Sequence, residues 1–227
     1  MNQTKYAAIL FDLDDTLLDF TACETKSLKR ACSLTDIILS AEWSKFWQTY
    51  QSISQKYWQQ KRHRDISRQQ IIETSLTDTL TALDIVADTS SLARVYWNTF
   101  CHTACLNPKV ADTIAYLSRS YKLGIVTNGY ADSQPSRLQA SGLDPYFSTV
   151  VVSESVGYRK PAPEIFKIAL DELQADSSAT LFVGDSIAHD YQGAVNAGLD
   201  FCYFGGASIE IQPQYAIAHM SQLQEIL

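Results

Sequence analysis

Four acidic residues follow an apolar run near the start of the chain. The stretch ILFDLDDTLLDF contains Asp12, Asp14, Asp15 and Asp19, with no lysine or arginine among them. Carboxylates this close together repel one another, and a carboxylate at the end of a hydrophobic strand is poorly solvated. A hard cation such as Mg²⁺ would offset this cost, because it prefers carboxylate oxygens as ligands. The acids are therefore candidates for chemistry that uses a metal ion.

Further polar residues follow three later apolar runs. Thr127 and Asn128 end one run, Lys160 follows the next, and Asp185 ends the last, with Asp190 beyond it. In phosphoryl transfer a protein mainly positions the reactants and neutralises charge, and these residue types serve those tasks. Lys160 would place a fixed positive charge near a phosphate, and Thr127 and Asn128 would bind its oxygens. Asp190 would orient these groups or the waters on a metal.

The acids divide by spacing into two groups. Asp12 and Asp14 lie on one side of an extended segment, because side chains alternate along it. One carboxylate can attack phosphorus, and a second, two residues further on, can donate a proton to the leaving oxygen and then activate water. Asp12 and Asp185 would hold the Mg²⁺ together. Asp15 and Asp19 are expected only to shape the turn and to cap the segment after it.

Four short apolar runs end at these polar residues, and we expect them to be buried parallel strands. Each run is partly β-branched and apolar on both faces, which is typical of strands covered on both sides. Ligands of such sheets bind outside the carboxyl ends of the strands, so the polar residues should meet in one crevice. The runs are YAAILFD, YKLGIVTNG, FSTVVVSES and ATLFVGDS.

Helical patterns separate these runs. The runs DFCYF and QYAIAHM can add two further strands, and residues 221–227 a closing helix. This alternation predicts an open, doubly wound α/β sheet. Helices are expected over 110–119, 133–140, 163–173 and 189–197.

One long segment interrupts the alternation. Residues 18–105 hold no convincing strand and indicate helices, so we expect a helical cap domain inserted into a core domain of residues 1–17 and 106–227. Thr21 and Glu24 fit a capping box at the start of the insertion.

Two patterns inside the insertion concern its faces. The basic run KRHR, residues 61–64, is expected to be a solvated helix end, with attraction of anionic substrates as the alternative. The stretch WSKFWQTYQSI forms an apolar stripe at helical spacing, which is typical of bundle core, although part of it could face a ligand. The stripe consists of Trp43, Phe46, Trp47, Tyr50 and Ile53.

Composition restricts the class of protein. The 227 residues are 46% hydrophobic and carry a net charge of −7, which argues against a nucleic-acid polymer or an anionic membrane as partner. The five cysteines include no CxxC pair. Cys101 and Cys105 are interpreted as packing residues, and a zinc site made of these two and His102 is rejected. No run approaches the roughly 20 apolar residues of a membrane span, and no signal peptide is recognised, so the protein is expected in the cytoplasm.

The motifs resemble those of the haloacid dehalogenase superfamily. DLDDT, VTNG, GYRKP and GDSIAHD stand in the order of its four motifs, and the match spans nearly the whole chain. The resemblance implies a Rossmann-like core with a helical cap inserted after the first strand. It implies Asp12 as nucleophile, Asp14 as acid/base, and Asp12, the Asp14 backbone carbonyl and Asp185 as Mg²⁺ ligands. True dehalogenases lack the second aspartate of the first motif, so Asp14 implies a phosphatase with Thr127 and Lys160 as its further catalytic residues.

A closer resemblance concerns the substrate. ILFDLDDTLLDF and VTNGYADSQPSRLQASGL resemble the pyrimidine 5′-nucleotidase branch, whose members remove phosphate from nucleotides such as dUMP, UMP and dTMP. We therefore expect a Mg²⁺-dependent phosphatase for small phosphomonoesters, with pyrimidine nucleoside monophosphates first. A sugar-phosphate or phosphoglycolate phosphatase is the alternative among enzymes. A phosphate-accepting signalling domain is the alternative outside them, but it would need no helical insert.

Overall fold

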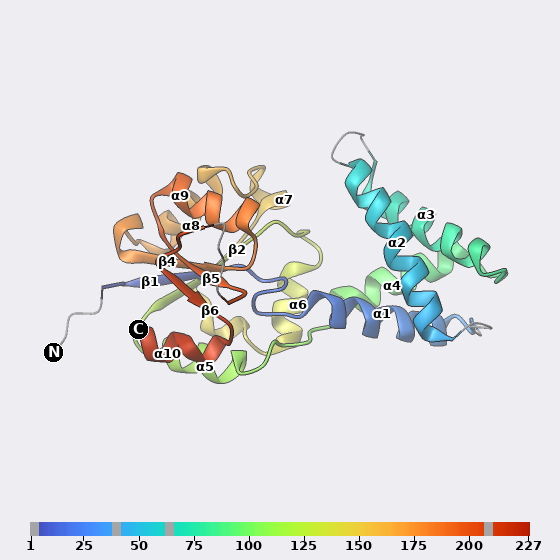
Figure 1. The fold of residues 1–227 in the computed structure, drawn as a ribbon, viewed down its shortest axis with the longest axis horizontal. Helices are drawn as coiled ribbons and strands as arrows, with labels where there is room; N and C mark the ends of the chain where they lie inside the picture. The colour runs from blue at the N-terminus through green and yellow to red at the C-terminus, as the bar shows by residue number, and fades with distance from the viewer. Residues whose placement is uncertain (1–4, 38–41, 62–65, 207–210) are drawn as a thin grey trace. The chain divides into compact units, whose positions relative to one another are not determined.

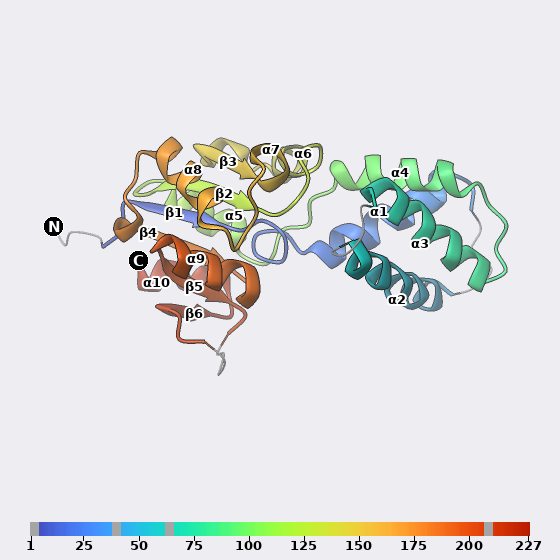
Figure 2. The same ribbon diagram turned by 90° about the horizontal axis from the view of Figure 1, so that it is seen from above.

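The computed structural model describes residues 5–37, 42–61, 66–206 and 211–227 (Figure 1, Figure 2). The basic run KRHR lies outside the described residues, apart from the backbone of Lys61 at the end of α2. In the part of the chain that the structure covers, no helix is both long and apolar enough to cross a membrane.

Within the described residues, six parallel strands form one sheet, in the order β3-β2-β1-β4-β5-β6. Every apolar run that was predicted as a strand contains one, so the doubly wound α/β prediction is confirmed. The first strand lies in the middle of the sheet, between β2 and β4. The strands are β1 (Ala8–Phe11), β2 (Lys122–Thr127), β3 (Thr149–Val152), β4 (Thr180–Gly184), β5 (Asp200–Phe204) and β6 (Tyr215–Ile217).

Side chains of the central strands alternate between two hydrophobic cores. Ile9 and Phe11 of β1 belong to one core, whereas Ala8 and Leu10 belong to the other. This period of two explains why the runs are apolar on both faces. Figure 1 shows α5 and α10 on one side of the sheet and α8 and α9 on the other. These helices are α5 (Val110–Leu117), α8 (Pro163–Leu173), α9 (Gln192–Ala197) and α10 (Leu223–Ile226).

The predicted helices are present: α8 has the predicted bounds, α5 begins as predicted and ends two residues early, and the other ends are shifted. The pattern over 189–197 begins as a wider π-helical turn at Ile187–Tyr191 and continues as α9, and the closing helix begins with a 3₁₀ turn at Met220–Gln222. The pattern at 133–140 is α6 (Gln134–Ser141). Shorter elements join the strands: α7 (Ser153–Val156) and 3₁₀ turns at Asp144–Tyr146 and Ser177–Ala179.

The chain divides into two compact units, residues 1–23 with 101–227 and residues 24–100. The second unit consists of helices, and the cap domain over 18–105 stays a prediction. Where the chain passes between the units, its two connecting segments pair: the N–H of Asp19 donates to the Cys105 carbonyl at 2.8 Å, and that of Asn107 to the Leu17 carbonyl at 3.0 Å. The helices are α1 (Phe20–Leu34), α2 (Trp43–Lys61), α3 (Arg68–Ala82) and α4 (Thr89–Cys101).

The start of α1 differs from the predicted capping box. The helix begins at Phe20, one residue before Thr21, so Thr21 is already helical and does not occupy the cap position. Asp19 caps the helix instead, because its Oδ1 accepts a hydrogen bond from the N–H of Ala22 at 2.8 Å. The capping role expected of Asp19 is therefore confirmed, and the box at Thr21 and Glu24 is corrected.

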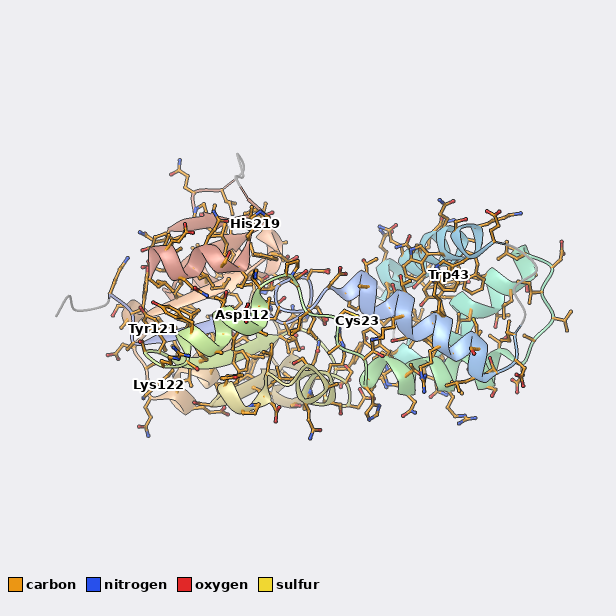
Figure 3. All side chains as sticks on the ribbon, turned by 90° about the horizontal axis from the view of Figure 1, so that it is seen from below. Cys23, Trp43, Asp112, Tyr121, Lys122 and His219 are labelled. Atoms are coloured by element: carbon orange, nitrogen blue, oxygen red, sulfur yellow. The ribbon has the colours of Figure 1, made fainter. Side chains whose placement is uncertain are left out.

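The aromatic stripe of α2 forms a ladder of rings inside the helical unit. Phe46 and Tyr50 are buried, whereas Trp43 (Figure 3) and Trp47 are partly exposed. The Trp43 and Trp47 rings stack with centroids 6.0 Å apart, and Tyr50 meets Tyr96 of α4 edge-on at 6.4 Å. The stripe is thus partly bundle core and partly a half-exposed surface of aromatic rings.

Candidate active site

Asp12 is the first residue after β1, and it is nearly buried. Its N–H donates to the Val183 carbonyl of the neighbouring strand at 2.9 Å, which continues the sheet by one residue and fixes the backbone. Its carboxylate forms an ion pair with Nζ of Lys160, a side chain only 2% exposed. The same Nζ lies 2.7 Å from Oδ1 of Asp190. One buried ammonium group therefore serves two buried carboxylates.

Three carboxylates meet beside this lysine. Asp12, Asp185 and Asp190 each offer an oxygen, and these oxygens lie within 4.8 Å of one another. The residues come from the ends of β1 and β4 and from the turn after β4, as the rule for parallel sheets predicts. A Cβ at Gly184 would lie 2.5 Å from Oδ2 of Asp190, so the glycine of the GD pair lets this acid approach the strand.

Burial changes the proton affinity of the cluster. The pKa of Asp12 is raised well above its ordinary value, because burial outweighs the opposing effect of Lys160 and the neighbouring acids add to it. Burial and the charge of Asp190 also raise the pKa of Asp185 to about 6. Burial alone would lower the pKa of Lys160, but the carboxylates of Asp12 and Asp190 raise it. The lysine thus stays charged, and a further cation would offset the remaining negative charge of the carboxylates.

Lys160 is positioned by Asn128, which follows β2. The side-chain amide of Asn128 donates to the Lys160 carbonyl at 3.0 Å and accepts from the Lys160 N–H at 2.8 Å. Both polar atoms of the Asn128 side chain thus bind the backbone of Lys160. The role predicted for this amide from the sequence is to bind phosphate oxygens. The residue connects the second and third motifs.

Asp14 points to a different set of partners. Its Oδ1 accepts a hydrogen bond from Nη1 of Arg137 at 2.6 Å, and its Oδ2 accepts one from Nε2 of Gln134 at 2.7 Å. The Gln134 Nε2 also lies 3.3 Å from Oγ1 of Thr127, which links the first two motifs. Sequence reasoning did not select Gln134 or Arg137. Their spacing of three, at the start of the helix that follows the TNG corner, was the available signal.

Asp15 has the turn role that was expected of it. Its backbone is in the left-handed region with φ of 60°, and its Oδ1 accepts from the Phe20 N–H at 3.1 Å. Thr16, also not selected from the sequence, directs its hydroxyl to Oδ1 of Asp185 at 3.3 Å. The residues after Asp12 thus shape the loop and also reach the fourth motif.

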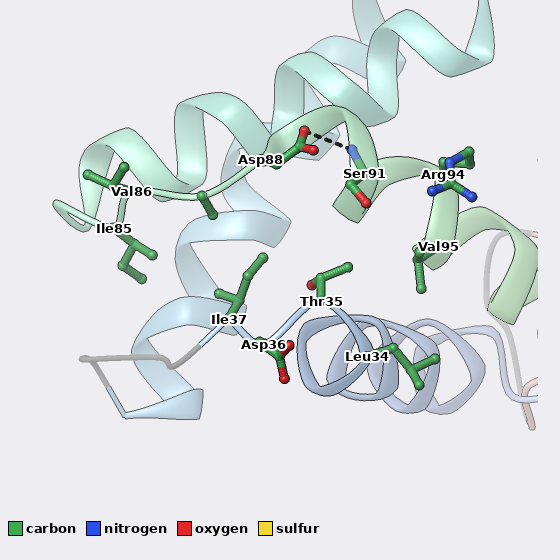
Figure 4. Close-up of a pocket in the computed structure, with 11 residues that line it drawn as sticks. Leu34, Thr35, Asp36, Ile37, Ile85, Val86, Asp88, Ser91, Arg94 and Val95 are labelled. Atoms are coloured by element: carbon green, nitrogen blue, oxygen red, sulfur yellow. Dashed lines mark hydrogen bonds between the residues drawn. The ribbon is translucent and has the colours of Figure 1, made fainter.

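A separate pocket of about 630 Å³ lies within the helical unit, near the ends of α1 and α3 and the start of α4 (Figure 4). Its lining includes Leu34, Ile85, Asp88 and Arg94 and none of the predicted site residues. It has no part in the arrangement of the carboxylates.

A family model for haloacid dehalogenase-like hydrolases matches residues 6–198. The chain belongs to this family. The matched region includes every residue of the carboxylate cluster and both residues that bind Asp14. The family recognised from the sequence is therefore confirmed, and so is its Rossmann-like fold.

Named relatives cover the whole chain. HAD-hydrolase YfnB of Bacillus subtilis (strain 168) is 32% identical, with 98% of this chain and 96% of the relative covered. Its crystal structure bound to magnesium, described as revealing interdomain movement, superposes with a TM-score of 0.82 over 99% of both chains. Pyrimidine 5′-nucleotidase YjjG of Escherichia coli (strain K12) is 28% identical over 98% of each chain. Glyceraldehyde 3-phosphate phosphatase of Methanothermobacter thermautotrophicus (strain ATCC 29096) is 27% identical, covering 97% of this chain and 99% of the relative.

Proposed function

We propose that this protein is a Mg²⁺-dependent phosphatase that acts through an aspartyl-phosphate on Asp12, with pyrimidine nucleoside 5′-monophosphates as its substrates. The observation that carries the proposal is a nearly buried carboxylate at the end of the central strand, paired with a buried lysine and surrounded by two further acids. Such a carboxylate is held in place and is little screened by water, which favours its attack on a bound phosphate.

The proposed roles follow from position. Asp12 attacks phosphorus, and Lys160 neutralises the charge of the phosphoryl oxygens. Asp14 protonates the leaving oxygen and then activates the water that hydrolyses the aspartyl-phosphate. Thr127 binds a phosphate oxygen, and Asp190 orients Lys160, to which it lies 2.7 Å away.

The residues present suit Mg²⁺. Asp12 and Asp185, with the backbone carbonyl of Asp14, supply the oxygen ligands that this cation prefers, and burial makes their shared negative charge costly without it. When bound, the cation neutralises this charge and polarises a phosphate oxygen. The relative YfnB, whose structure is described as bound to magnesium, supports the same choice.

The helical unit supports a nucleotide as substrate. Its α2 presents partly exposed indole rings at Trp43 and Trp47, and aromatic faces of this kind can stack on a nucleobase. The name of YjjG, pyrimidine 5′-nucleotidase, supports the same substrate class. The named glyceraldehyde 3-phosphate phosphatase keeps a sugar-phosphate substrate as the second candidate.

A substrate panel tests both levels of the proposal. Phosphate release is measured with para-nitrophenyl phosphate, dUMP, UMP, dTMP, purine monophosphates, phosphoglycolate and a hexose phosphate, each with Mg²⁺ and with excess chelator. We expect turnover that requires Mg²⁺, with the highest kcat/KM for the pyrimidine nucleotides.

The outcomes separate the candidates. Higher kcat/KM for phosphoglycolate or a hexose phosphate would reject the nucleotidase proposal and leave the phosphatase chemistry intact. Stable phosphorylation of Asp12 without turnover of any substrate would favour the signalling domain. Full activity in chelator would contradict the role of the metal.

A further inference from the structure

Two side chains of α6 donate hydrogen bonds to the Asp14 carboxylate, one to each of its oxygens. The bonds from Arg137 and Gln134 to Oδ1 and Oδ2 are short, at 2.6 and 2.7 Å. The two residues stand three apart and so occupy one side of the helix. A carboxylate that receives one donor on each oxygen cannot rotate about its Cβ–Cγ bond without breaking both bonds.

The side chains that donate these bonds are themselves fixed. Arg137 is fully buried and Gln134 is 1% exposed, while the Asp14 side chain keeps 24% of its surface exposed. Nη1 of Arg137 lies 3.4 Å from Oε1 of Gln134, which ties the pair together. The buried ends thus hold rigidly a carboxylate whose other side remains accessible.

The surrounding backbone is shaped around this pair. A Cβ at Gly129 would lie 1.7 Å from Nε2 of Gln134, so only glycine leaves room for this amide beside Asp14. Nε of Arg137 donates to the Thr103 carbonyl at 3.3 Å, and the Cys23 side chain (Figure 3) is a further hydrogen-bond partner of Arg137. Cys23 and Thr103 belong to the two segments that connect the units, so the guanidinium is anchored on both.

Burial of the Arg137 guanidinium opposes the stability of the fold. A fully buried guanidinium loses its hydration, and a single partly exposed carboxylate repays that loss only in good geometry. An apolar residue at 137 would fill the same space without that cost. The charged pair is more readily explained by what it does to Asp14 than by stability.

We propose that Gln134 and Arg137 are positioning residues, which fix the Asp14 carboxylate in the orientation from which it exchanges protons with the leaving group and with water. This inference rests on the proposed function, because Asp14 has an acid/base role only in that reaction. A group that transfers protons must be held in alignment, and small misplacements lower the rate strongly.

A double-mutant cycle tests the inference. Gln134→Met keeps the length of the side chain and removes the amide, and Gln139→Met is the matched control on the exposed side of α6. With para-nitrophenyl phosphate we expect Gln134→Met to lower kcat by about 10- to 100-fold and to change KM by less than about twofold. In an Asp14→Ala background the same substitution should change kcat by less than about twofold, because the carboxylate that Gln134 is proposed to position is then absent and its longer contact to Thr127 remains a minor one. The control should match its parent protein.

Arg137 supplies a second readout. Arg137→Met should reproduce the loss of kcat, and Arg137→Lys, which keeps a positive charge near Oδ1, should recover part of it. If Gln134→Met or Arg137→Met lowers kcat by the same factor in the Asp14→Ala variant as in the wild-type protein, the residue has a structural role and the inference is overturned.

Failure of the proposed function is a separate result. If the wild-type protein releases no phosphate from any substrate, the interaction of Gln134 with Asp14 is measured by urea unfolding of the protein without substrate. The shifts in urea midpoint caused by Gln134→Met and Asp14→Ala should then be non-additive. Additive shifts would overturn the inference independently of activity.

Discussion

At the residue scale, the acids of the first motif differ in their partners more than in their chemistry. Asp12 has a buried lysine, Asp14 has a buried arginine and a glutamine, and Asp15 and Asp19 bind backbone N–H groups. Three kinds of environment thus arise within eight residues of sequence. The partners, more than the residue type, decide which carboxylate is suited to attack, to proton transfer or to capping.

The first prediction concerns Asp12. Asp12→Asn keeps the shape of the side chain and replaces a nucleophilic carboxylate with a poor nucleophile, so we expect nearly all phosphate release to be lost. Circular dichroism should show an unchanged fold. Turnover within about tenfold of the wild-type rate would exclude Asp12 as the attacking group.

The second prediction concerns the proton donor. Asp14→Asn should reduce kcat/KM far less for para-nitrophenyl phosphate than for UMP, because a good leaving group departs without a proton and an alkoxide does not. The ratio of the two losses is the measured quantity. Equal losses for both substrates would remove Asp14 from the acid role.

At the element scale, strand ends and the turns after them build the site. The turn after β4 widens into a π-helical turn, and within it Asp190 reaches back to accept from the Ser186 N–H at 2.9 Å and to lie beside Lys160. The corner after β2 brings Asn128 to the Lys160 backbone. Each of these corners therefore contributes a residue that contacts Lys160 of the third motif.

The third prediction concerns the loss in free energy of unfolding that the cluster of carboxylates causes when no metal is bound. The pKa of Asp185 is about 6 in the folded protein, against an ordinary value of 3.8. The folded state therefore binds a proton more tightly than the unfolded state between these values, and stability is lost as pH rises through that window. Asp185→Asn should unfold at a higher temperature than the wild-type protein at pH 7 in chelator, with the difference disappearing near pH 4.

Magnesium provides the control for this prediction. Mg²⁺ at pH 7 should raise the melting temperature of the wild-type protein, because a ligand that binds only the folded state stabilises it. Asp185→Asn should respond much less. A variant that is less stable than the wild-type protein in chelator at pH 7 would contradict the assigned electrostatic cost.

At the scale of the whole molecule, the proposed function assigns the phosphate chemistry to the core unit and the choice of substrate to the helical unit. The core unit holds the carboxylate cluster and Lys160, all at or next to the ends of the strands. The helical unit supplies aromatic surface and a pocket of its own. Selection among phosphomonoesters is therefore expected to depend on residues of the helical unit.

The fourth prediction tests this division. Trp47→Leu removes one partly exposed ring of the α2 ladder, so it should lower kcat/KM for UMP by more than about fivefold while leaving para-nitrophenyl phosphate within about twofold. Tyr116→Leu, a change at an exposed aromatic residue of the core unit, is the matched control. Equal effects of Trp47→Leu on both substrates would show that the ring has no part in base selection.

Much of the fold was determined by local sequence. Short apolar runs bounded by polar corners predict the strands, because a strand buried on both faces needs apolar side chains in both registers. The alternation with helices, together with the general behaviour of parallel sheets, then places Asp12 and Asp185 at one edge. The long helical interruption was equally visible, since it lacks any such run.

The tertiary structure decided which side chains bind one another. Arg137 reaches Asp14 across 123 positions of sequence, and Asn128 turns to the Lys160 backbone across 32. Neither contact leaves a local pattern, because side-chain direction depends on where a helix begins and on what packs behind it. The start of α1 at Phe20 shows the same limit, since Asp19 and Thr21 are both good caps and only the path of the connecting segments selects between them. Local sequence thus determines the residue types and the strand ends, whereas tertiary packing determines the partners that distinguish one carboxylate from the next.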